Sequence, residues 1–452
     1  RVPFGVLGNF CPKRSINNQP TSQPNNPMKK HLLLCLLPLA VSAQTPEARV
    51  SQMADQLEQK VIGYRRHFHQ NPELSNREVE TSGFVADKLK ALGLEVQTGI
   101  AKTGVVALLK GGKPGPCVAL RADMDALPVP ERAPLPFASK AKGEYNGQEV
   151  PVMHACGHDT HMAMLLGAAE ILTTMRKDIK GTVKFIFQPA EEGAPRGEEG
   201  GAKLMIQEGV LENPKVEAIF GIHINAQTEV GKIKYRPEGT MAAVDGLRIK
   251  VKGRQSHGAY PWLGVDPIVV SSQIILGLQT IVSRQLELTK EAAVITVGSL
   301  HGGVRSNIIP EEVQMEGTIR SLDGAMQTIV HERIKRTAVN IAESAGATAE
   351  VEITRGYPVT YNNPALTERT VPSLHKAAGK ENVSLTKAVT GAEDFSFFQE
   401  KVPGVFVFVG GMPKGKDVAE TAAHHTPDFF IDESGMKTGV KAYCLMALDY
   451  LK

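Results

Sequence analysis

The 452-residue sequence predicts an α/β fold that is interrupted by a smaller α+β domain. Three observations indicate this organisation: helical and strand-like apolar segments alternate at both ends of the chain, the middle has a different strand and helix order, and the length exceeds one ordinary core. An apolar fraction of 42%, a charged fraction of 22% and a net charge of +3 are typical of a globular protein. No basic stripe with interleaved aromatic residues is present, so nucleic acid is not expected as a partner.

The beginning of the chain is expected to be a targeting segment. Residues 28–30 are Met-Lys-Lys, residues 32–39 are apolar, and residues 41–43 are small. This order is typical of a secretory signal peptide over residues 28–43, and residues 1–27 would then be upstream or vector-derived sequence. We therefore expect an exported protein, periplasmic or secreted. The apolar run is too short to span a bilayer, so no membrane anchor is expected.

The first part of the α/β domain is expected over residues 46–239. Apolar residues at helical spacing predict helices, and short continuous apolar runs predict strands that are buried on both faces. The helices are expected at 50–68, 84–92 and 162–175, and the strands at 117–120, 183–187 and 218–224.

The middle of the chain, residues 240–355, is expected to form the inserted domain. Its order of strand, helix, strand, strand, helix and strand is the split βαβ arrangement of a ferredoxin-like fold. The strands are expected at 247–251, 293–300, 313–320 and 348–354, and the helices at 267–284 and 327–345. Residues 356–452 resume the first domain, with a strand at 403–411 and a helix at 434–451.

A nine-residue stretch, Met153–His161, contains one thiol, three imidazoles and a carboxylate. Cysteine and histidine are good zinc ligands, and a glycine-containing turn lets two of them converge on one ion. The alternative is a solvated turn with one buried structural cysteine. After signal removal only Cys117, Cys156 and Cys444 would remain, which is not a disulfide framework. We interpret Cys156 as a metal-bound thiolate and the other two as core residues.

Glu191 and Glu192 follow the predicted strand at 183–187, and carboxyl ends of such strands are where α/β sheets bind ligands. Because adjacent side chains in an extended chain point in opposite directions, one carboxylate is expected to hold metal while the other reaches a metal-bound water. A charged solvated loop is the alternative. His223 inside an apolar strand and the His424–His425 pair are, taken alone, better explained as core histidines than as metal ligands.

Taken together, seven motifs resemble the amidohydrolase branch of the dinuclear-metal carboxypeptidase and aminoacylase family. This branch includes hippurate hydrolases, N-acetyldiaminopimelate deacetylases and plant indole-acetyl-amino-acid hydrolases. The resemblance implies a catalytic α/β domain with two divalent ions (zinc, manganese, cobalt or nickel) and a ferredoxin-like lid that often also mediates dimerisation. The motifs are Cys156–Asp159, Glu191–Glu192, Gly221–His223, Gln255–Pro261, Ser306–Pro310, Gly317–Arg320 and Gly391–Phe395.

Carried over to matching positions, the resemblance implies five metal ligands, with Cys156 as the bridging group. Glu191 would be the general base and later the acid. A histidine that binds metal in related branches is absent beside Asp123 and Asp125, so these carboxylates are expected to support the ligands instead. His154 and His161 are expected to be neighbours of the site. The implied ligands are Cys156, His158, Glu192, His223 and His425.

In the lid, the resemblance implies that His257 donates a hydrogen bond to the developing oxyanion, either in its own chain or across a dimer. Arg320 with Asn307 would bind a free α-carboxylate of the substrate. The expected activity is metal-dependent hydrolysis of the amide bond of N-acyl amino acids (N-acetyl, N-benzoyl or similar) by a homodimer or higher homo-oligomer. The alternatives are a metallo-dipeptidase or carboxypeptidase, and a non-catalytic exported binding protein. The presence of Glu191 beside complete ligand positions favours an enzyme.

Overall fold

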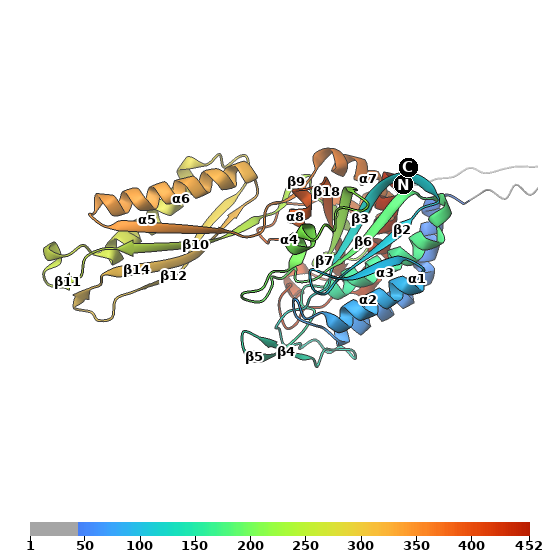
Figure 1. The fold of residues 1–452 in the computed structure, drawn as a ribbon, viewed down its shortest axis with the longest axis horizontal. Coiled ribbons are helices and arrows are strands. Elements are labelled where there is room, and N and C mark those ends of the chain that lie inside the picture. The colour runs from blue at the N-terminus through green and yellow to red at the C-terminus, as the bar shows by residue number, and fades with distance from the viewer. Residues whose placement is uncertain (1–43) are drawn as a thin grey trace, which may run out of the picture. The chain divides into compact units, whose positions relative to one another are not determined.

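The larger sheet of the molecule has eight strands, and its central strands β6, β3, β7 and β18 run parallel (Figure 1). The computed structural model describes residues 44–452, so the predicted signal peptide and the segment before it lie outside the described residues. The strand order is β1 (Glu95–Ile100), β2 (Gly104–Lys110), β6 (Lys180–Gln188), β3 (Lys113–Asp123), β7 (Val216–Glu229), β18 (Gly404–Met412), β8 (Ile233–Tyr235) and β17 (Val383–Leu385).

This sheet is buried on both faces because apolar residues occupy consecutive positions of its central strands. In β3, for example, Val118 and Leu120 belong to one core, while Cys117 and Ala119 belong to a second core on the other face. The first core is completed by α1 (Pro46–Gln70), α2 (Val79–Ala91), α3 (His158–Thr174), α7 (Pro364–Ala378) and α9 (Met436–Tyr450). The second is completed by α4 (Gly201–Gln207) and α8 (Phe395–Gln399).

The inserted lid has its own four-stranded antiparallel sheet and its own apolar core. The strand order β12-β14-β10-β15 and two helices that pack on the sheet confirm the predicted ferredoxin-like fold. All six elements lie within residues 240–355, the predicted limits of the lid. They are β10 (Ala243–Lys252), α5 (Pro267–Thr280), β12 (Ala293–Gly302), β14 (Glu312–Ser321), α6 (Gly324–Ser344) and β15 (Thr348–Arg355).

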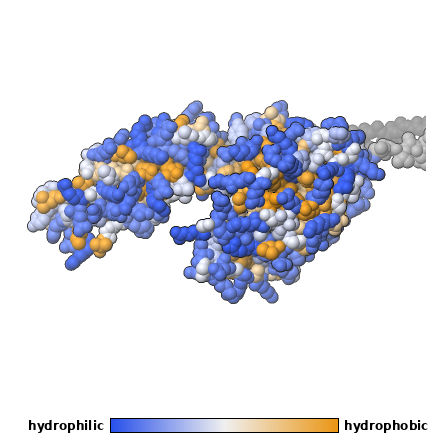
Figure 2. Space-filling model, in the orientation of Figure 1, coloured by the Kyte–Doolittle hydropathy of each residue, from blue (hydrophilic) through white to orange (hydrophobic). Residues whose placement is uncertain are grey.

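Helix α5 has two different sides. Val270, Ile274 and Leu278 are buried in the lid core, whereas Val269 and Leu276 are exposed. With the π-helical turn that follows it, the segment Pro267–Gln285 is long and apolar enough to pass as a membrane span by composition, but its buried side packs against the lid sheet. Figure 2 shows orange apolar atoms on the lid among blue hydrophilic ones.

Several short strands had no clear signal in the sequence. The β4 (Lys142–Tyr145) and β5 (Gln148–Pro151) hairpin consists of mostly exposed residues, so it lacks the apolar alternation by which strands are recognised. The same holds for two-residue β11 (Ser256–His257), which pairs with β13 (Ile308–Ile309). Two further short strands, β9 (Glu238–Met241) and β16 (Thr360–Asn362), pair with each other.

Candidate metal centre

Polar side chains gather where the central parallel strands end. Strand β3 ends at Asp123, β6 ends three residues before Glu191, and β7 carries His223. Because these strands are parallel, their carboxyl ends lie at one edge of the sheet, where α/β folds place ligand sites. Cys156 joins them from the loop that precedes α3.

The turn between Cys156 and His158 requires glycine. Gly157 has a φ of 101°, which L side chains rarely adopt, and a Cβ atom there would lie 2.3 Å from the Cγ2 atom of Ile224 on β7. This close approach to β7 places Cys156 beside His223, and α3 begins directly at His158.

The Cys156 thiol lies at the centre of the cluster. Its Sγ is 3.4 Å from Nε2 of His223 and 3.2 Å from Nε2 of His425, and the same His425 nitrogen is 3.2 Å from a carboxylate oxygen of Glu192. Two groups of three ligand atoms share Cys156, and the atoms of each group lie within 4.8 Å of one another. The first is Cys156, His158 and His223, and the second is Cys156, Glu192 and His425. All five candidate ligands are therefore brought together.

His158 provides a test of whether this cluster suits a cation. Its Nδ1 donates to the Asp125 carbonyl at 2.8 Å, which leaves Nε2 with a lone pair. That buried nitrogen has no hydrogen-bond partner among residues 44–452, and carboxylate oxygens of Glu191 and Glu192 lie 3.8 and 3.9 Å away. An unpartnered imidazole lone pair beside carboxylates and a thiol is the donor set that a divalent transition metal prefers.

Two further histidines lie near the cluster but are not candidate ligands. His161 has no free ring nitrogen, and His154 lies outside both ligand groups. Nδ1 of His161 donates to Asp123 at 2.6 Å, and its Nε2 accepts the backbone N–H of Ile224 at 2.8 Å, so both nitrogens are used. His154 is fully buried outside both ligand groups, and burial lowers its pKa to about 3. Both therefore lie in the structure as neighbours of the cluster.

The adjacent His424 and His425 have different surroundings. Nδ1 of His424 donates to the Cys156 carbonyl at 3.0 Å, and its Nε2 accepts the N–H of Ala226 at 3.1 Å. His425 has a positive φ of 63°, a strained conformation that turns its ring toward the thiol. His425, and not His424, is therefore the candidate ligand of the pair.

The backbone conformation of Glu191 and Glu192 differs from the one predicted. They lie in a turn, not in extended chain, because Ala190 has a φ of 53°. Both carboxylates consequently approach His158, and the prediction that they point in opposite directions is wrong. Asp125 fixes this turn, since its two carboxylate oxygens each accept a backbone N–H, from Glu191 and Glu192, both at 3.0 Å.

Beneath the turn lies a buried arginine surrounded by carboxylates. Arg121 contacts Asp123 at 2.6 Å, Glu393 at 2.9 Å and Asp394 at 3.0 Å. Burial, followed by the negative charges of Glu393 and other nearby carboxylates, raises the pKa of Glu191 well above its ordinary value. A carboxyl group that binds protons this readily is suited to accept and return a proton during a reaction.

Three residues of this framework were not assigned a role from the sequence. Arg121 stands directly before the predicted supporting carboxylates, and a charged residue inside an apolar strand was the signal that could have identified it. Glu78 accepts the N–H of Ala190 at 2.9 Å, and burial with the nearby Asp125 charge raises its pKa to about 7. The hydroxyl of Tyr357 donates to the Glu191 carbonyl at 2.7 Å. Glu78 and Tyr357 reach the turn only through tertiary contacts, so no local sequence pattern could have identified them.

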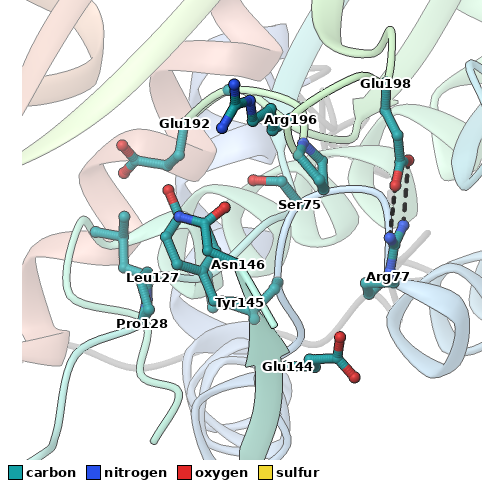
Figure 3. Close-up of a pocket in the computed structure, with 14 residues that line it drawn as sticks. Ser75, Arg77, Leu127, Pro128, Glu144, Tyr145, Asn146, Glu192, Arg196 and Glu198 are labelled. Carbon is teal, nitrogen blue, oxygen red and sulfur yellow. Dashed lines mark hydrogen bonds and ion pairs between the residues drawn. The ribbon is translucent and has the colours of Figure 1, made fainter. Parts of the chain in front are cut away.

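Two cavities adjoin the cluster. The first, which we call the cleft, has a volume of about 760 Å³ and is lined by Cys156, Glu192 and Arg320 among others. The second, the hairpin cavity, has a volume of about 620 Å³ and lies beside the β4–β5 hairpin (Figure 3). Its lining includes Leu127 and Tyr145, and Glu192 lines both cavities. A ligand bound at Glu192 therefore has space on two sides.

The predicted lid residues do not all reach the cleft. Arg320 lines it, and its Nη1 donates to the Thr390 carbonyl at 3.4 Å. His257 and Asn307 are exposed and absent from the lining of the cleft. Nδ1 of His257 accepts the N–H of Ala259 at 3.0 Å. The structure of one chain thus does not bring His257 and Asn307 to the cluster, and their roles stay predictions.

Comparison with known proteins places the chain among metallopeptidases. Residues 119–449 match peptidase family M20/M25/M40. Thermostable carboxypeptidase 2 of Saccharolobus solfataricus is 41% identical over 397 residues, which cover 87% of this chain and 96% of the relative. N-acetyl-L-cysteine deacetylase of Bacillus subtilis is 39% identical over 380 residues, covering 84% and 85%.

A solved structure agrees with these relatives. The Bacillus subtilis YXEP protein, a dinuclear metal binding peptidase of the M20 family, superposes with a TM-score of 0.73 at 35% identity, covering 88% of this chain and 99% of that one. The matched residues include every candidate ligand. The chain belongs to peptidase family M20/M25/M40, and within it to the amidohydrolase branch, as a metal-dependent hydrolase of amide or peptide bonds.

Proposed function

We propose that this protein hydrolyses the amide bond of N-acyl amino acids and releases a carboxylic acid and a free amino acid. The observation that carries the proposal is the arrangement around Cys156, where two ligand groups share one thiol while Glu191 stands beside them as a further buried carboxylate. Cys156, His158 and His223 would hold one divalent ion, and Cys156, Glu192 and His425 would hold a second, with zinc, manganese, cobalt or nickel as the candidate metals. When bound, these ions would polarise the amide carbonyl and acidify water.

The residues of the chain would divide the remaining work. Glu191 accepts the proton of the attacking water and delivers it to the leaving nitrogen, which its position beside His158 and Glu192 supports. Asp125 keeps His158 and the glutamate turn in place, because it contacts both. Arg320 in the cleft would bind the α-carboxylate of the substrate in a bidentate manner, and Asn307, which lies outside the cleft of its own chain, would join it only from a partner chain.

The two cavities support a substrate that extends to both sides of the cluster. The cleft contains Arg320, so it suits the amino-acid part with its carboxylate. The hairpin cavity, on the other side of Glu192, would then take the acyl part, with Leu127 and Tyr145 as its apolar contacts among charged residues such as Arg196. In Figure 3, Glu192 and Leu127 lie on the same side of the hairpin cavity, across from the ion pair of Arg77 with Glu198.

A carboxypeptidase or dipeptidase is the second candidate. It is supported by the relative of Saccharolobus solfataricus, which is named a carboxypeptidase and is 41% identical. A peptide also carries an α-carboxylate for Arg320, and the scissile bond has the same chemistry. The two candidates differ in whether the group on the acyl side carries a free amine.

We further propose that the working unit is a homodimer in which His257 serves the partner's cleft as oxyanion donor. Two features support this arrangement: His257 is exposed away from its own cleft, and the exposed side of α5 carries Val269 and Leu276. The apolar segment before residue 44 supports export to the periplasm or medium, which stays a proposal.

A substrate panel tests the proposed function. The purified protein, loaded in turn with zinc, manganese, cobalt or nickel, is offered N-acetyl and N-benzoyl amino acids and the corresponding dipeptides. We expect the N-acyl amino acids to have the highest kcat/KM. Faster hydrolysis of dipeptides with a free amine would favour the second candidate instead, and loss of the advantage when the α-carboxylate is amidated would support the role of Arg320.

A further inference from the structure

One hydrogen bond links the Glu191 turn to the chain segment that leaves the lid. Tyr357 lies two residues after β15 ends, and its hydroxyl donates to the backbone carbonyl of Glu191 at 2.7 Å. Its ring packs edge-on against Phe397 of α8, with ring centroids 5.9 Å apart. The side chain is thus held from behind, and only its hydroxyl faces the turn.

The backbone around Tyr357 is fixed to the lid. The Tyr357 carbonyl accepts the N–H of Val244 at 3.0 Å, and the Val244 carbonyl accepts the N–H of Gly356 at 3.1 Å, so the two strands that connect the lid are joined here. Asp245, the next residue on β10, is buried and accepts from both Gly356 N–H at 3.3 Å and Nε2 of His331 on α6 at 2.6 Å. The position of Tyr357 therefore depends on the lid.

The Glu191 backbone is held from two directions. Its N–H is bound by Asp125, a residue of the catalytic domain, at 3.0 Å. Its carbonyl accepts a hydrogen bond from the hydroxyl of Tyr357, which lies on the segment that leaves the lid. A turn that contains a left-handed Ala190 is not a low-energy conformation by itself, so its shape depends on the contacts that hold it. Asp125 and Glu78 hold it from the catalytic domain, and Tyr357 holds it from the lid segment.

We propose that Tyr357 is a positioning residue that sets the orientation of the Glu191 carboxylate and couples it to the lid. The hydroxyl does this through the backbone carbonyl of Glu191. Tyr357 also lines the cleft, and the substitution by Phe keeps the ring and so leaves that wall in place. The inference rests on the proposed function for its catalytic consequence, because Glu191 is the base there. The structural part, that the lid segment fixes the glutamate turn, can be measured separately.

The first experiment replaces Tyr357 by Phe, which removes the hydroxyl and keeps the ring. A misplaced base lowers the rate without weakening substrate binding, so kcat should fall about ten- to a hundredfold while KM and metal content stay unchanged. Tyr361→Phe is the matched control, since Tyr361 lies on the same segment with an exposed side chain. In a Glu191→Gln background, Tyr357→Phe should change the residual rate less than about twofold.

The second experiment measures amide hydrogen exchange in the peptide that covers residues 188–193. Tyr357→Phe should speed this exchange about fivefold or more, and Tyr361→Phe should not. Asp245→Asn, which weakens the lid contact, should also speed exchange, but with no further increase when Tyr357 is already Phe. Additive effects of the two substitutions would show that Tyr357 does not carry the coupling.

The outcomes separate the inference from the proposed function. If the wild-type protein hydrolyses no amide, the proposed function fails, and the exchange data alone decide whether Tyr357 fixes the turn. In an active enzyme, an unchanged kcat for Tyr357→Phe overturns the inference. An equal loss in the wild-type and Glu191→Gln backgrounds overturns it too, because the hydroxyl would then act independently of Glu191.

Discussion

The strand ends of the catalytic domain and the lid contribute to the candidate site in different ways. At the strand ends, Cys156 and His158 are buried; Cys156 contacts His223, and His158 contacts the backbone carbonyl and the carboxylate of Asp125. In the lid, His257 and Asn307 are exposed, and only Arg320 of the predicted set lines the cleft. The candidate ligands are thus brought together by the fold of one chain, whereas His257 and Asn307 would reach a cleft only in an arrangement of more than one chain.

The largest effect is expected when the proposed base at the strand ends is removed and the candidate metal ligands are kept. Glu191→Gln should lower kcat about 10²- to 10⁴-fold, because the base that accepts the proton is lost, while metal content stays unchanged. Glu192→Gln is the matched comparison, since its carboxylate lies 3.2 Å from His425 and should be needed to retain metal. Steady-state kinetics with elemental analysis of both variants checks this. Near wild-type turnover of Glu191→Gln would refute the assignment of the base.

The next effect tests the lid. His257→Ala should lower kcat about 10²- to 10³-fold at unchanged metal content, the usual consequence of losing one oxyanion donor. His301→Ala, at another exposed histidine of the lid, is the control and should be neutral. Mixing His257→Ala with Glu191→Gln under subunit exchange should restore activity if His257 serves the partner's cleft. Proven exchange without recovery would contradict a role across the dimer.

A third prediction compares two buried cysteines of the catalytic domain. Cys156→Ser should weaken metal affinity about ten- to a hundredfold, because a hydroxyl is a much poorer ligand than a thiolate. Cys117→Ser should leave metal affinity unchanged, since Cys117 lies in the second apolar core away from the cluster. Metal titration with a competing chelator measures both. Equal affinities for the two variants would show that Cys156 is a core residue only.

The smallest effect concerns stability behind the metal cluster. Both ring nitrogens of buried His69 face carboxylates, Asp159 at 2.8 Å and Glu131 at 2.9 Å. Burial and Arg65 lower the pKa of His69, but these two hydrogen bonds outweigh them and leave it raised above 6.5. A raised folded-state pKa stabilises the protein fully below the unfolded value and less as pH rises through the folded value.

His69→Gln should therefore cost about 1–3 kcal/mol of unfolding free energy at acidic pH, and this cost should shrink as pH rises above about 6.5. Denaturant unfolding of the metal-free protein at several pH values measures the difference. His67→Gln is the control: burial lowers the pKa of the neighbouring His67, so its effect should not shrink with rising pH. A pH-independent cost for His69→Gln would mean that His69 is neutral in the fold.

The sequence predicted most of the long elements because apolar burial decides them, but it did not predict the helix α7 or the buried strand β2. The strand expected at 183–187 is β6, and the helix expected at 267–284 is α5 with its π-helical end. The exposed β4–β5 hairpin was not predicted, since solvent-facing residues carry no periodic signal.

The candidate site was predictable where residues cluster in sequence and unpredictable where only tertiary contacts bring them together. Cys156 and His158 stand in one motif, and their type alone indicates metal. The opposite orientation expected for Glu191 and Glu192 failed because Ala190 takes a left-handed conformation that no local pattern signals. Tyr357 reaches Glu191 from 166 residues away, a contact that only the fold creates.

The metal content of the active protein tests the central claim most directly. Protein purified without chelator, freed of excess metal and assayed on an N-acyl amino acid should contain about two divalent ions per chain. Chelation should abolish the activity, and it should return in proportion to the metal that binds again. Full activity in protein that contains no metal by elemental analysis would contradict the account.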